Sequence, residues 1–344
     1  MRAARKTRGI RKGRPGAVAL LAGAVALALT GCAGGSGPTP AAPAPSTASP
    51  GTAAAGDAES LPAGFSGDFA ANGPVRVHYV TGGHGPALVL LHGWPETWYA
   101  WAKMMPKLAE SYTVVAVDLR GLGDSGPAPT DAGNYTADAL AGDVQAVLDK
   151  MGQHQINLAG HDWGGNVALS FAAEHRDEVR KLIVLEAPPT TDYLHLVAQY
   201  PNLFWWDSLF NGAGGDLPEQ LIAGRERTFY SSIFANSGGA IDAAEVDRYV
   251  ADYSRPGSTH AGMEYFRQQD VGETQADQLI ARQGKLPMPV LGVGAEHSMG
   301  ALVGAELPRI AATVTSAVVP GTNHWLLDEA PDAVTTLITN FLRQ

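Results

Sequence analysis

Seven short runs of apolar and β-branched residues recur along the chain, at residues 75–83, 87–93, 112–121, 156–162, 181–188, 289–296 and 315–324. Most are apolar at every position, which is typical of strands covered by helices on both faces. Segments with apolar residues at helical spacing lie at 97–110, 136–151, 165–175 and 332–342. This alternation predicts an α/β fold, with a mostly parallel sheet and helices on both faces.

The alternation stops between Pro188 and Pro287. This stretch carries aromatic clusters, one of them at 200–210, but no convincing strand. A helical insertion after the carboxyl end of a strand lies over the edge where open α/β sheets bind ligands. We therefore expect a helical lid at 189–287, between a first core segment at 61–188 and a second at 288–344.

The first 31 residues have the features of a secretory signal: a basic start and an apolar run at 17–30. The run is shorter than the roughly 20 residues that span a bilayer. Cys32 is the only cysteine, so no internal disulfide can form. The sequence LTGC at 29–32 resembles the bacterial lipoprotein box, which implies export and a lipid on Cys32 at the outer face of the cell membrane. A buried free thiol is the alternative.

Residues 32–60 are expected to form a disordered tether, because Pro, Ala, Gly, Ser and Thr dominate the segment and offer little apolar surface to bury. The whole chain has 24 Lys and Arg against 34 Asp and Glu. Removal of the signal leaves 17 basic residues and a net charge of −17. This charge argues against nucleic acid as a partner.

Four motifs follow the ends of predicted strands: HGWPETWYAW at 92–101, DLRGLGDSG at 118–126, GHDWGG at 160–165 and GTNHW at 321–325. In this order they resemble the α/β-hydrolase superfamily, and more narrowly its branch of epoxide hydrolases and haloalkane dehalogenases. The resemblance covers about residues 65–343. No dinucleotide fingerprint and no cluster with metal-ligand spacing is present in the sequence, so we expect neither an organic cofactor nor a metal.

Asp162 stands at the centre of a Gly-x-residue-x-Gly turn, where a serine is usual. No Gly-x-Ser-x-Gly segment occurs elsewhere, so Asp162 takes the position of the nucleophile. A free aspartate is ionised at neutral pH and attacks a saturated carbon without a base. Water must then hydrolyse the resulting ester, which needs a general base and an oxyanion hole. The alternative role for Asp162 is that of a helix N-cap.

The resemblance assigns the remaining catalytic roles. His324 matches the position of the base, and the backbone N–H groups of Trp94 and Trp163 match the oxyanion hole. Many relatives place the acid partner of the histidine where this chain has Ser298. Glu186 matches an alternative acid site, and Glu296 is the second candidate. We expect Asp118 and Arg120 to form a structural loop pair, His92 to shape the oxyanion turn and His161 to flank the elbow.

The lid departs from the pattern of the epoxide hydrolases that it resembles. Those enzymes protonate the opened epoxide with two phenols, or with a histidine and a phenol. The corresponding positions here are Trp206 and Phe266, and Tyr265 could substitute only after a shift of its helix, because neighbouring helical residues point about 100 degrees apart. Trp205 and Trp206 are candidate substrate contacts or ordinary lid aromatics. An indole N–H gives up its proton less readily than a phenol. It is well suited to binding a halide.

Together these features predict a hydrolase that acts through an aspartyl ester on a small, apolar substrate. An epoxide is the leading substrate and an alkyl halide or haloacid the alternative. The third reading is a noncatalytic hydrophobic-ligand-binding lipoprotein, although binding alone would not require Asp162 and His324. The sequence gives no indication of the oligomeric state.

Overall fold

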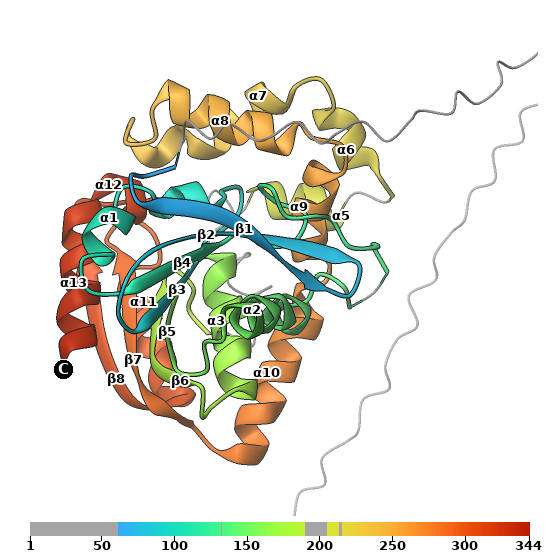
Figure 1. The fold of residues 1–344 in the computed structure, drawn as a ribbon. Coiled ribbons are helices and arrows are strands. Elements are labelled where there is room, and N and C mark those ends of the chain that lie inside the picture. The colour runs from blue at the N-terminus through green and yellow to red at the C-terminus, as the bar shows by residue number, and fades with distance from the viewer. Residues whose placement is uncertain (1–60, 132, 190–204, 213–214) are drawn as a thin grey trace, which may run out of the picture. The chain divides into compact units, whose positions relative to one another are not determined.

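A computed structural model describes residues 61–131, 133–189, 205–212 and 215–344. Within them, eight strands form one sheet in the order β1-β2-β4-β3-β5-β6-β7-β8 (Figure 1). Strands β3 to β8 are parallel, whereas β1 and β2 pair antiparallel. The strands are β1 (Phe65–Asn72), β2 (Val75–Gly83), β3 (Ala87–Leu91), β4 (Thr113–Val117), β5 (Ile156–His161), β6 (Val179–Leu185), β7 (Leu286–Ala295) and β8 (Ala311–Val319).

Helices cover both faces of this sheet, as the sequence predicts (Figure 1). One apolar cluster joins the sheet to α2 (Ala137–Met151), α3 (Trp163–Glu174), α10 (Gln269–Gln283) and α11 (Ala301–Glu306). A second cluster joins the other face to α1 (Met105–Leu108), α12 (Leu326–Glu329) and α13 (Pro331–Arg343). The central strands are buried on both sides, which explains why their sequences are continuously apolar.

The lid lies between β6 and β7, where the strand pattern of the sequence stops. Its helices lie across the edge of the sheet at which the parallel strands end (Figure 1). The lid contains α5 (Trp205–Gly212), α6 (Leu217–Ile222), α7 (Glu226–Phe234), α8 (Ala243–Tyr253) and α9 (Ser258–Arg267). Short 3-10 helices complete the described chain: η2 (Trp98–Trp101), η3 (Ala235–Ser237) and η4 (Leu307–Arg309).

All seven predicted strands are present, and β1 is an eighth strand that the apolar pattern does not predict. Only one of the eight residues of β1 is fully buried, because it is an antiparallel edge strand. An edge strand of this kind lacks the continuous apolar run by which the other strands were identified. The predicted signal, tether and lipidation site at Cys32 lie outside the described residues. Within the described part of the chain, no helix has the length and apolarity needed to cross a membrane.

Candidate active site

Asp162 stands on a sharp turn between β5 and α3, with φ 51° and ψ −122°. This backbone conformation is rare for a residue with a side chain and is typical of functional sites. Glycines on both sides make the turn possible. A Cβ on Gly160 would overlap the carbonyl oxygen of Gly164, and a Cβ on Gly164 would overlap that of Leu91. The elbow predicted from the sequence is therefore formed, and it raises Asp162 above the end of the sheet.

The carboxylate of Asp162 accepts a hydrogen bond of 2.8 Å from the backbone N–H of Trp94 through Oδ1. The second expected donor, the N–H of Trp163, belongs to the first residue of α3, where backbone N–H groups have no acceptor inside the helix. Asp162 is the N-cap of α3, and the positive end of a helix dipole favours negative charge there, although the side chain makes no capping hydrogen bond. The N–H of Trp94 favours negative charge on Oδ1, whereas Oδ2 faces His324.

His324 lies between two carboxylates. Its Nε2 is 3.6 Å from Oδ2 of Asp162, and its Nδ1 is 3.1 Å from Oε2 of Glu186. The contact with Glu186 keeps a proton on Nδ1, so that Nε2 carries the free electron pair that a general base needs. The three side chains that the sequence analysis assigned to catalysis thus meet in one place.

Glu186 follows β6 directly and adopts a positive φ of 54°. Its side chain is fully buried, and its oxygens accept backbone N–H groups from Ala295 at 2.6 Å and Met299 at 3.4 Å. The other candidate, Glu296, instead accepts the N–H of Gly321 at 2.7 Å. Glu186 rather than Glu296 is therefore the carboxylate that contacts His324, and Ser298 leaves the more usual acid position without a carboxylate.

The turn before Trp94 is held by His92, as the sequence analysis expected. Nδ1 of His92 donates to the carbonyl of Gly93 at 2.7 Å, and Nε2 accepts the N–H of Leu119 at 3.0 Å. Burial lowers the pKa of His92, which keeps the ring neutral and able to fill both roles. The ring thereby fixes the peptide that presents the N–H of Trp94.

A second buried pair, Glu96 with His161, lies behind the site and was missed in the sequence. Nδ1 of His161 is 3.1 Å from Oε2 of Glu96, and both side chains are fully buried. Nε2 of His161 donates to the carbonyl oxygen of His324 at 2.9 Å. The pair therefore supports the loop of the base. The signal was present in the sequence, because Glu96 belongs to the HGWPE motif and His161 precedes Asp162.

Burial by itself would lower the pKa of His161, but the charge and hydrogen bond of Glu96 raise it to about 9. Burial raises the pKa of Glu96, yet the charge and hydrogen bond of His161, together with the charges of His324 and His92, outweigh this and the net shift is downward. Both groups are therefore ionised at neutral pH. The stability that His161 gains is fully present below about pH 6.5 and is lost as the pH rises through about 9. The contribution of Glu96 is lost instead on acidification.

Replacement of Glu96 by glutamine should lower the free energy of unfolding by about 3–5 kcal/mol at pH 7, because it leaves a buried imidazolium without its counter-charge. The difference from the unchanged protein should shrink as the pH rises past about 9. Urea unfolding at several pH values measures both effects. Glu110→Gln, which removes the exposed ion pair with Lys107, is the matched control and should change stability little. A pH-independent difference would contradict the charged state assigned to His161.

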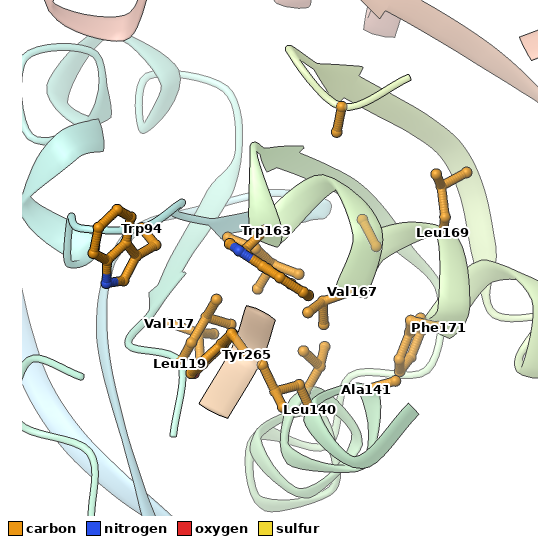
Figure 2. Close-up of a cluster of buried hydrophobic side chains, with 14 of the residues drawn as sticks. Trp94, Val117, Leu119, Leu140, Ala141, Trp163, Val167, Leu169, Phe171 and Tyr265 are labelled. Atoms are coloured by element: carbon orange, nitrogen blue, oxygen red, sulfur yellow. The ribbon is translucent and has the colours of Figure 1, made fainter. Parts of the chain in front are cut away.

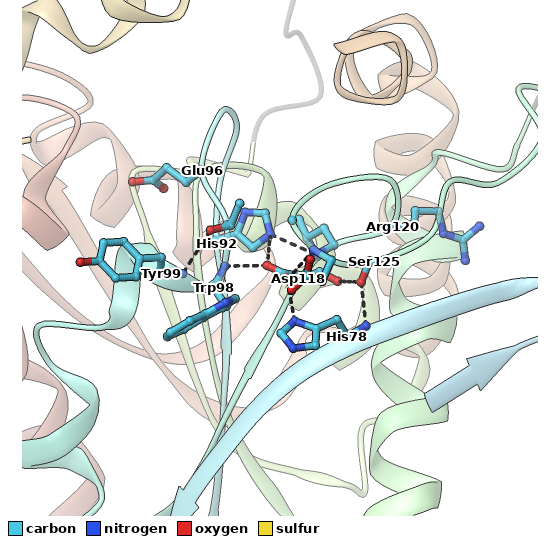
Figure 3. Close-up of polar contacts among 12 residues, drawn as sticks. His78, His92, Glu96, Trp98, Tyr99, Asp118, Arg120 and Ser125 are labelled. Atoms are coloured by element: carbon cyan, nitrogen blue, oxygen red, sulfur yellow. Dashed lines mark hydrogen bonds and ion pairs between the residues drawn. The ribbon is translucent and has the colours of Figure 1, made fainter. Parts of the chain in front are cut away.

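Asp118 and Arg120 do not pair with each other, so this expectation was wrong (Figure 3). Asp118 contacts Nδ1 of His78 at 2.7 Å and accepts the N–H of Trp98 at 2.8 Å. Arg120 points away and forms two 2.7 Å hydrogen bonds to the carboxylate of Asp143 in α2. The two side chains leave the loop in different directions and each brace a different neighbour. Both remain structural.

Aromatic rings gather around Trp94 next to the elbow and form an aromatic wall, and Figure 2 shows Trp94 and Trp163 in the buried apolar cluster. The indole of Trp94 is the centre of this wall, with ring centroids of the lid at 5.1–6.4 Å. Phe266 packs edge-on against both Trp94 at 5.1 Å and Trp163 at 5.3 Å. Trp206 lies 5.9 Å from Trp94, whereas Trp205 is 42% exposed. Of the two lid tryptophans, Trp206 therefore adjoins the site.

Tyr265 does not replace the missing phenol. Its ring is fully buried beside Trp163, at 5.5 Å, and its hydroxyl donates to the carbonyl oxygen of Arg120 at 2.7 Å. A donor role for Tyr265 would require its helix to shift, because its hydroxyl is engaged with the backbone of Arg120. The hydroxyl of Tyr265 fastens the lid to the core instead, and Tyr265 is removed from the candidate substrate contacts.

The chain is similar to known proteins in sequence and in fold. The family model of the α/β hydrolase fold matches residues 86–331. The chain is 34% identical to a soluble epoxide hydrolase of Corynebacterium sp. (strain C12), over 75% of this chain and 91% of the relative. It is 31% identical to a fluoroacetate dehalogenase of Burkholderia sp., over 81% and 94%. The crystal structure of the Cif epoxide hydrolase from Acinetobacter nosocomialis superposes with a TM-score of 0.74 at 26% identity, over 82% and 90%.

Proposed function

We propose that this chain, which belongs to the α/β hydrolase fold family and to its branch of epoxide hydrolases and dehalogenases, hydrolyses a small apolar substrate through an ester on Asp162. It is a hydrolase of that family, and the substrate and the route are the proposal. The observation that carries the proposal is the position of His324 between Asp162 and Glu186, at 3.6 Å and 3.1 Å.

In the first step Oδ2 of Asp162 attacks a saturated carbon of the substrate, because Oδ1 is held by the N–H of Trp94. A bond forms between this oxygen and the carbon, and the bond from carbon to the leaving group breaks. The leaving group takes the electron pair: a halide departs as an anion, whereas the ring oxygen of an epoxide stays attached as an alkoxide, which takes a proton from solvent. Oδ1 becomes the carbonyl oxygen of the ester and already lies in the oxyanion hole.

In the second step Nε2 of His324 takes a proton from water, and the resulting hydroxide adds to Cγ of Asp162. The N–H groups of Trp94 and Trp163 stabilise the charge that develops on Oδ1. Glu186 stabilises the imidazolium that forms. The tetrahedral intermediate then expels the product alkoxide, which takes the proton from His324. Asp162 is left as the carboxylic acid and returns to the carboxylate by releasing the second proton of the water to solvent.

A single turnover in heavy-oxygen water tests this route. With enzyme in excess over a neutral epoxide such as styrene oxide, one heavy oxygen should enter the carboxyl group of Asp162, and the product should be unlabelled. Mass spectrometry of the peptide that contains Asp162 and of the product measures both. A label in the product and none in Asp162 would mean that water attacks the substrate directly, and the proposal would be abandoned.

An epoxide is the leading substrate, because the relatives named epoxide hydrolases support it. One observation favours a halide as the second candidate. Three of the four tyrosines in the described part of the lid, Tyr230, Tyr253 and Tyr265, already hydrogen-bond to protein oxygens through their hydroxyls. The fourth, Tyr249, is buried with its ring against Tyr99 and Phe234. Opening of an epoxide leaves an alkoxide that needs a proton, whereas a halide leaves as a stable anion.

The aromatic wall supports a neutral substrate rather than a carboxylate such as fluoroacetate. The aromatic rings around Trp94 carry no charge. Arg120, in the loop after β4, is bound to Asp143 and does not offer its charge to a substrate. A carboxylate held there would be buried without a counter-charge. We expect kcat/KM for fluoroacetate to be at least about 100-fold below that for styrene oxide. Steady-state assays with both substrates measure this, and comparable values would contradict the assignment of a neutral substrate.

We further propose that the chain is exported and carries a lipid on Cys32. The support is the basic and apolar N-terminus and the LTGC sequence at 29–32. The mature N-terminus of the protein from its native membrane should begin at Cys32 with the added mass of acyl groups. Cys32→Ser should abolish that mass and release the protein into the medium or periplasm. An unmodified Cys32 in membrane-bound protein would exclude lipidation.

A further inference from the structure

Trp325, the residue after His324, connects the loop of the base to the lid. Its side chain is 2% exposed, and its indole N–H donates to Oδ1 of Asn236 at 2.6 Å. Asn236 belongs to η3 of the lid, 89 positions away in the sequence. The fold thus joins a core loop and a lid turn that are far apart along the chain.

The indole of Trp325 lies against the imidazole of His324 on one side and against the lid on the other. Its centroid is 4.9 Å from that of His324, edge-to-face at 82°, and 4.9 Å from that of Phe234 in α7. Edge-to-face packing at this distance restricts both rings. A displacement of the indole would therefore displace the imidazole.

In the described residues, the hydrogen bonds of His324 come from the core, whereas Trp325 contacts it by ring packing. Glu186 holds Nδ1, and His161 holds the carbonyl oxygen. These contacts fix the loop and the Nδ1 edge of the imidazole. The indole of Trp325 packs against the imidazole and links it to the lid. The lid therefore reaches the base through Trp325.

From this geometry, and on the basis of the function proposed above, we infer that Asn236 and Trp325 are positioning residues through which the lid holds His324 in place for ester hydrolysis. Their effect is specific to one step. Asp162 is set by its own elbow and by the N–H of Trp94, and neither contact involves the lid turn. Attack by Asp162 needs no base, whereas ester hydrolysis requires His324 to hold water close to Cγ in a narrow geometry.

A second link keeps the lid attached when the first is removed. Nζ of Lys103 lies 2.8 Å from Asp328 in α12 and 2.9 Å from Glu245 in α8. This ion pair joins the lid to the segment after His324 but does not touch the imidazole. Loss of the hydrogen bond from Trp325 to Asn236 should therefore disturb the ring without releasing the lid.

Rapid-quench kinetics with styrene oxide, read by mass spectrometry of the Asp162 peptide, separates ester formation from ester decay in the full mature chain. Asn236→Ala and Trp325→Phe each remove one partner of the hydrogen bond and keep the surrounding bulk largely intact. In both variants decay should slow about threefold to tenfold, the effect of one lost neutral hydrogen bond, while formation changes by less than about twofold. The double variant should be no slower than the slower single variant.

Two further variants distinguish positioning from general loosening of the lid. Asn236→Asp keeps an acceptor for the indole at an exposed position and should restore normal decay. Asn211→Ala removes another lid asparagine, whose amide donates to Asp207 at 2.9 Å within α5, and should leave both rates unchanged. Thermal unfolding of each variant checks that the fold is retained.

Equal slowing of both steps, unchanged decay in Asn236→Ala, or additive effects in the double variant would each overturn the inference while the ester route stands. Failure to detect any ester in the unchanged protein and in His324→Gln would overturn the proposed function, and the inference with it. Detection of the ester on the Asp162 peptide of the unchanged protein therefore tells failure of the inference from failure of the proposed function.

Discussion

Replacement of Asp162 by asparagine should lower kcat at least about 10⁴-fold, the scale of losing a nucleophile. The amide keeps the shape of the carboxylate and an oxygen for the N–H of Trp94, but it lacks the negative charge that attacks carbon. Asparagine also tolerates positive φ better than most residues, so the elbow at φ 51° should persist. Turnover of styrene oxide and the thermal midpoint measure the two effects.

The control for this experiment is the mass of the peptide itself. An amide in the position of a nucleophile can be hydrolysed back to aspartate, which would restore activity and mislead the assay. The peptide should retain the mass of asparagine throughout. Near-normal turnover with that mass intact would mean that Asp162 is only the N-cap of α3, the alternative role that the sequence allowed.

Replacement of His324 by glutamine should produce a stable ester on Asp162 instead of an inert enzyme. The first step needs only the carboxylate, so the peptide that contains Asp162 should gain the mass of the substrate. Without a base, hydrolysis should fall about 10²–10⁴-fold, the usual contribution of general base catalysis. Intact mass spectrometry after brief mixing with styrene oxide measures the ester, and its decay gives the second rate constant.

His324→Gln also tests whether ester formation depends on Asp162 alone and ester hydrolysis on His324. A second variant, Glu186→Gln, should keep ester formation but slow hydrolysis, because Nδ1 of His324 loses the carboxylate that stabilises the imidazolium. Glu296→Gln is the matched control, because among the described residues that carboxylate accepts the N–H of Gly321 and makes no contact with His324. If His324→Gln formed no ester while retaining its fold, the imidazole would be required for the first step and the proposed mechanism would fail.

The central strands and the motifs that follow them could be predicted, because each depends only on residues within a short segment. Runs such as β3 and β5 are apolar at every position because helices cover both faces. The elbow was equally readable, since only glycine fits at residues 160 and 164 beside a strand and a crossing helix. β1 was not predictable in this way, because an edge strand buries few side chains and its pairing with β2 is decided by its neighbour.

The partners of polar side chains were harder to predict from the sequence than the strands. Asp118 and Arg120 are two residues apart, and this proximity suggested a pair, yet each side chain found its partner elsewhere, in His78 and Asp143. Glu96 and His161 lie 65 positions apart, and no periodicity connects them. Such pairs depend on where strand ends bring side chains together, which a one-dimensional pattern does not record.

By itself the sequence determined the α/β sheet, the place of the helical lid and the identity of Asp162 at the elbow, because each depends on spacing along a short segment. Only the tertiary structure decided that Glu186 rather than Glu296 holds His324, that Tyr265 faces Arg120, and that Trp325 reaches Asn236. These outcomes depend on the directions of side chains from elements that are distant in sequence. Those directions are fixed only when the sheet, its helices and the lid pack against one another.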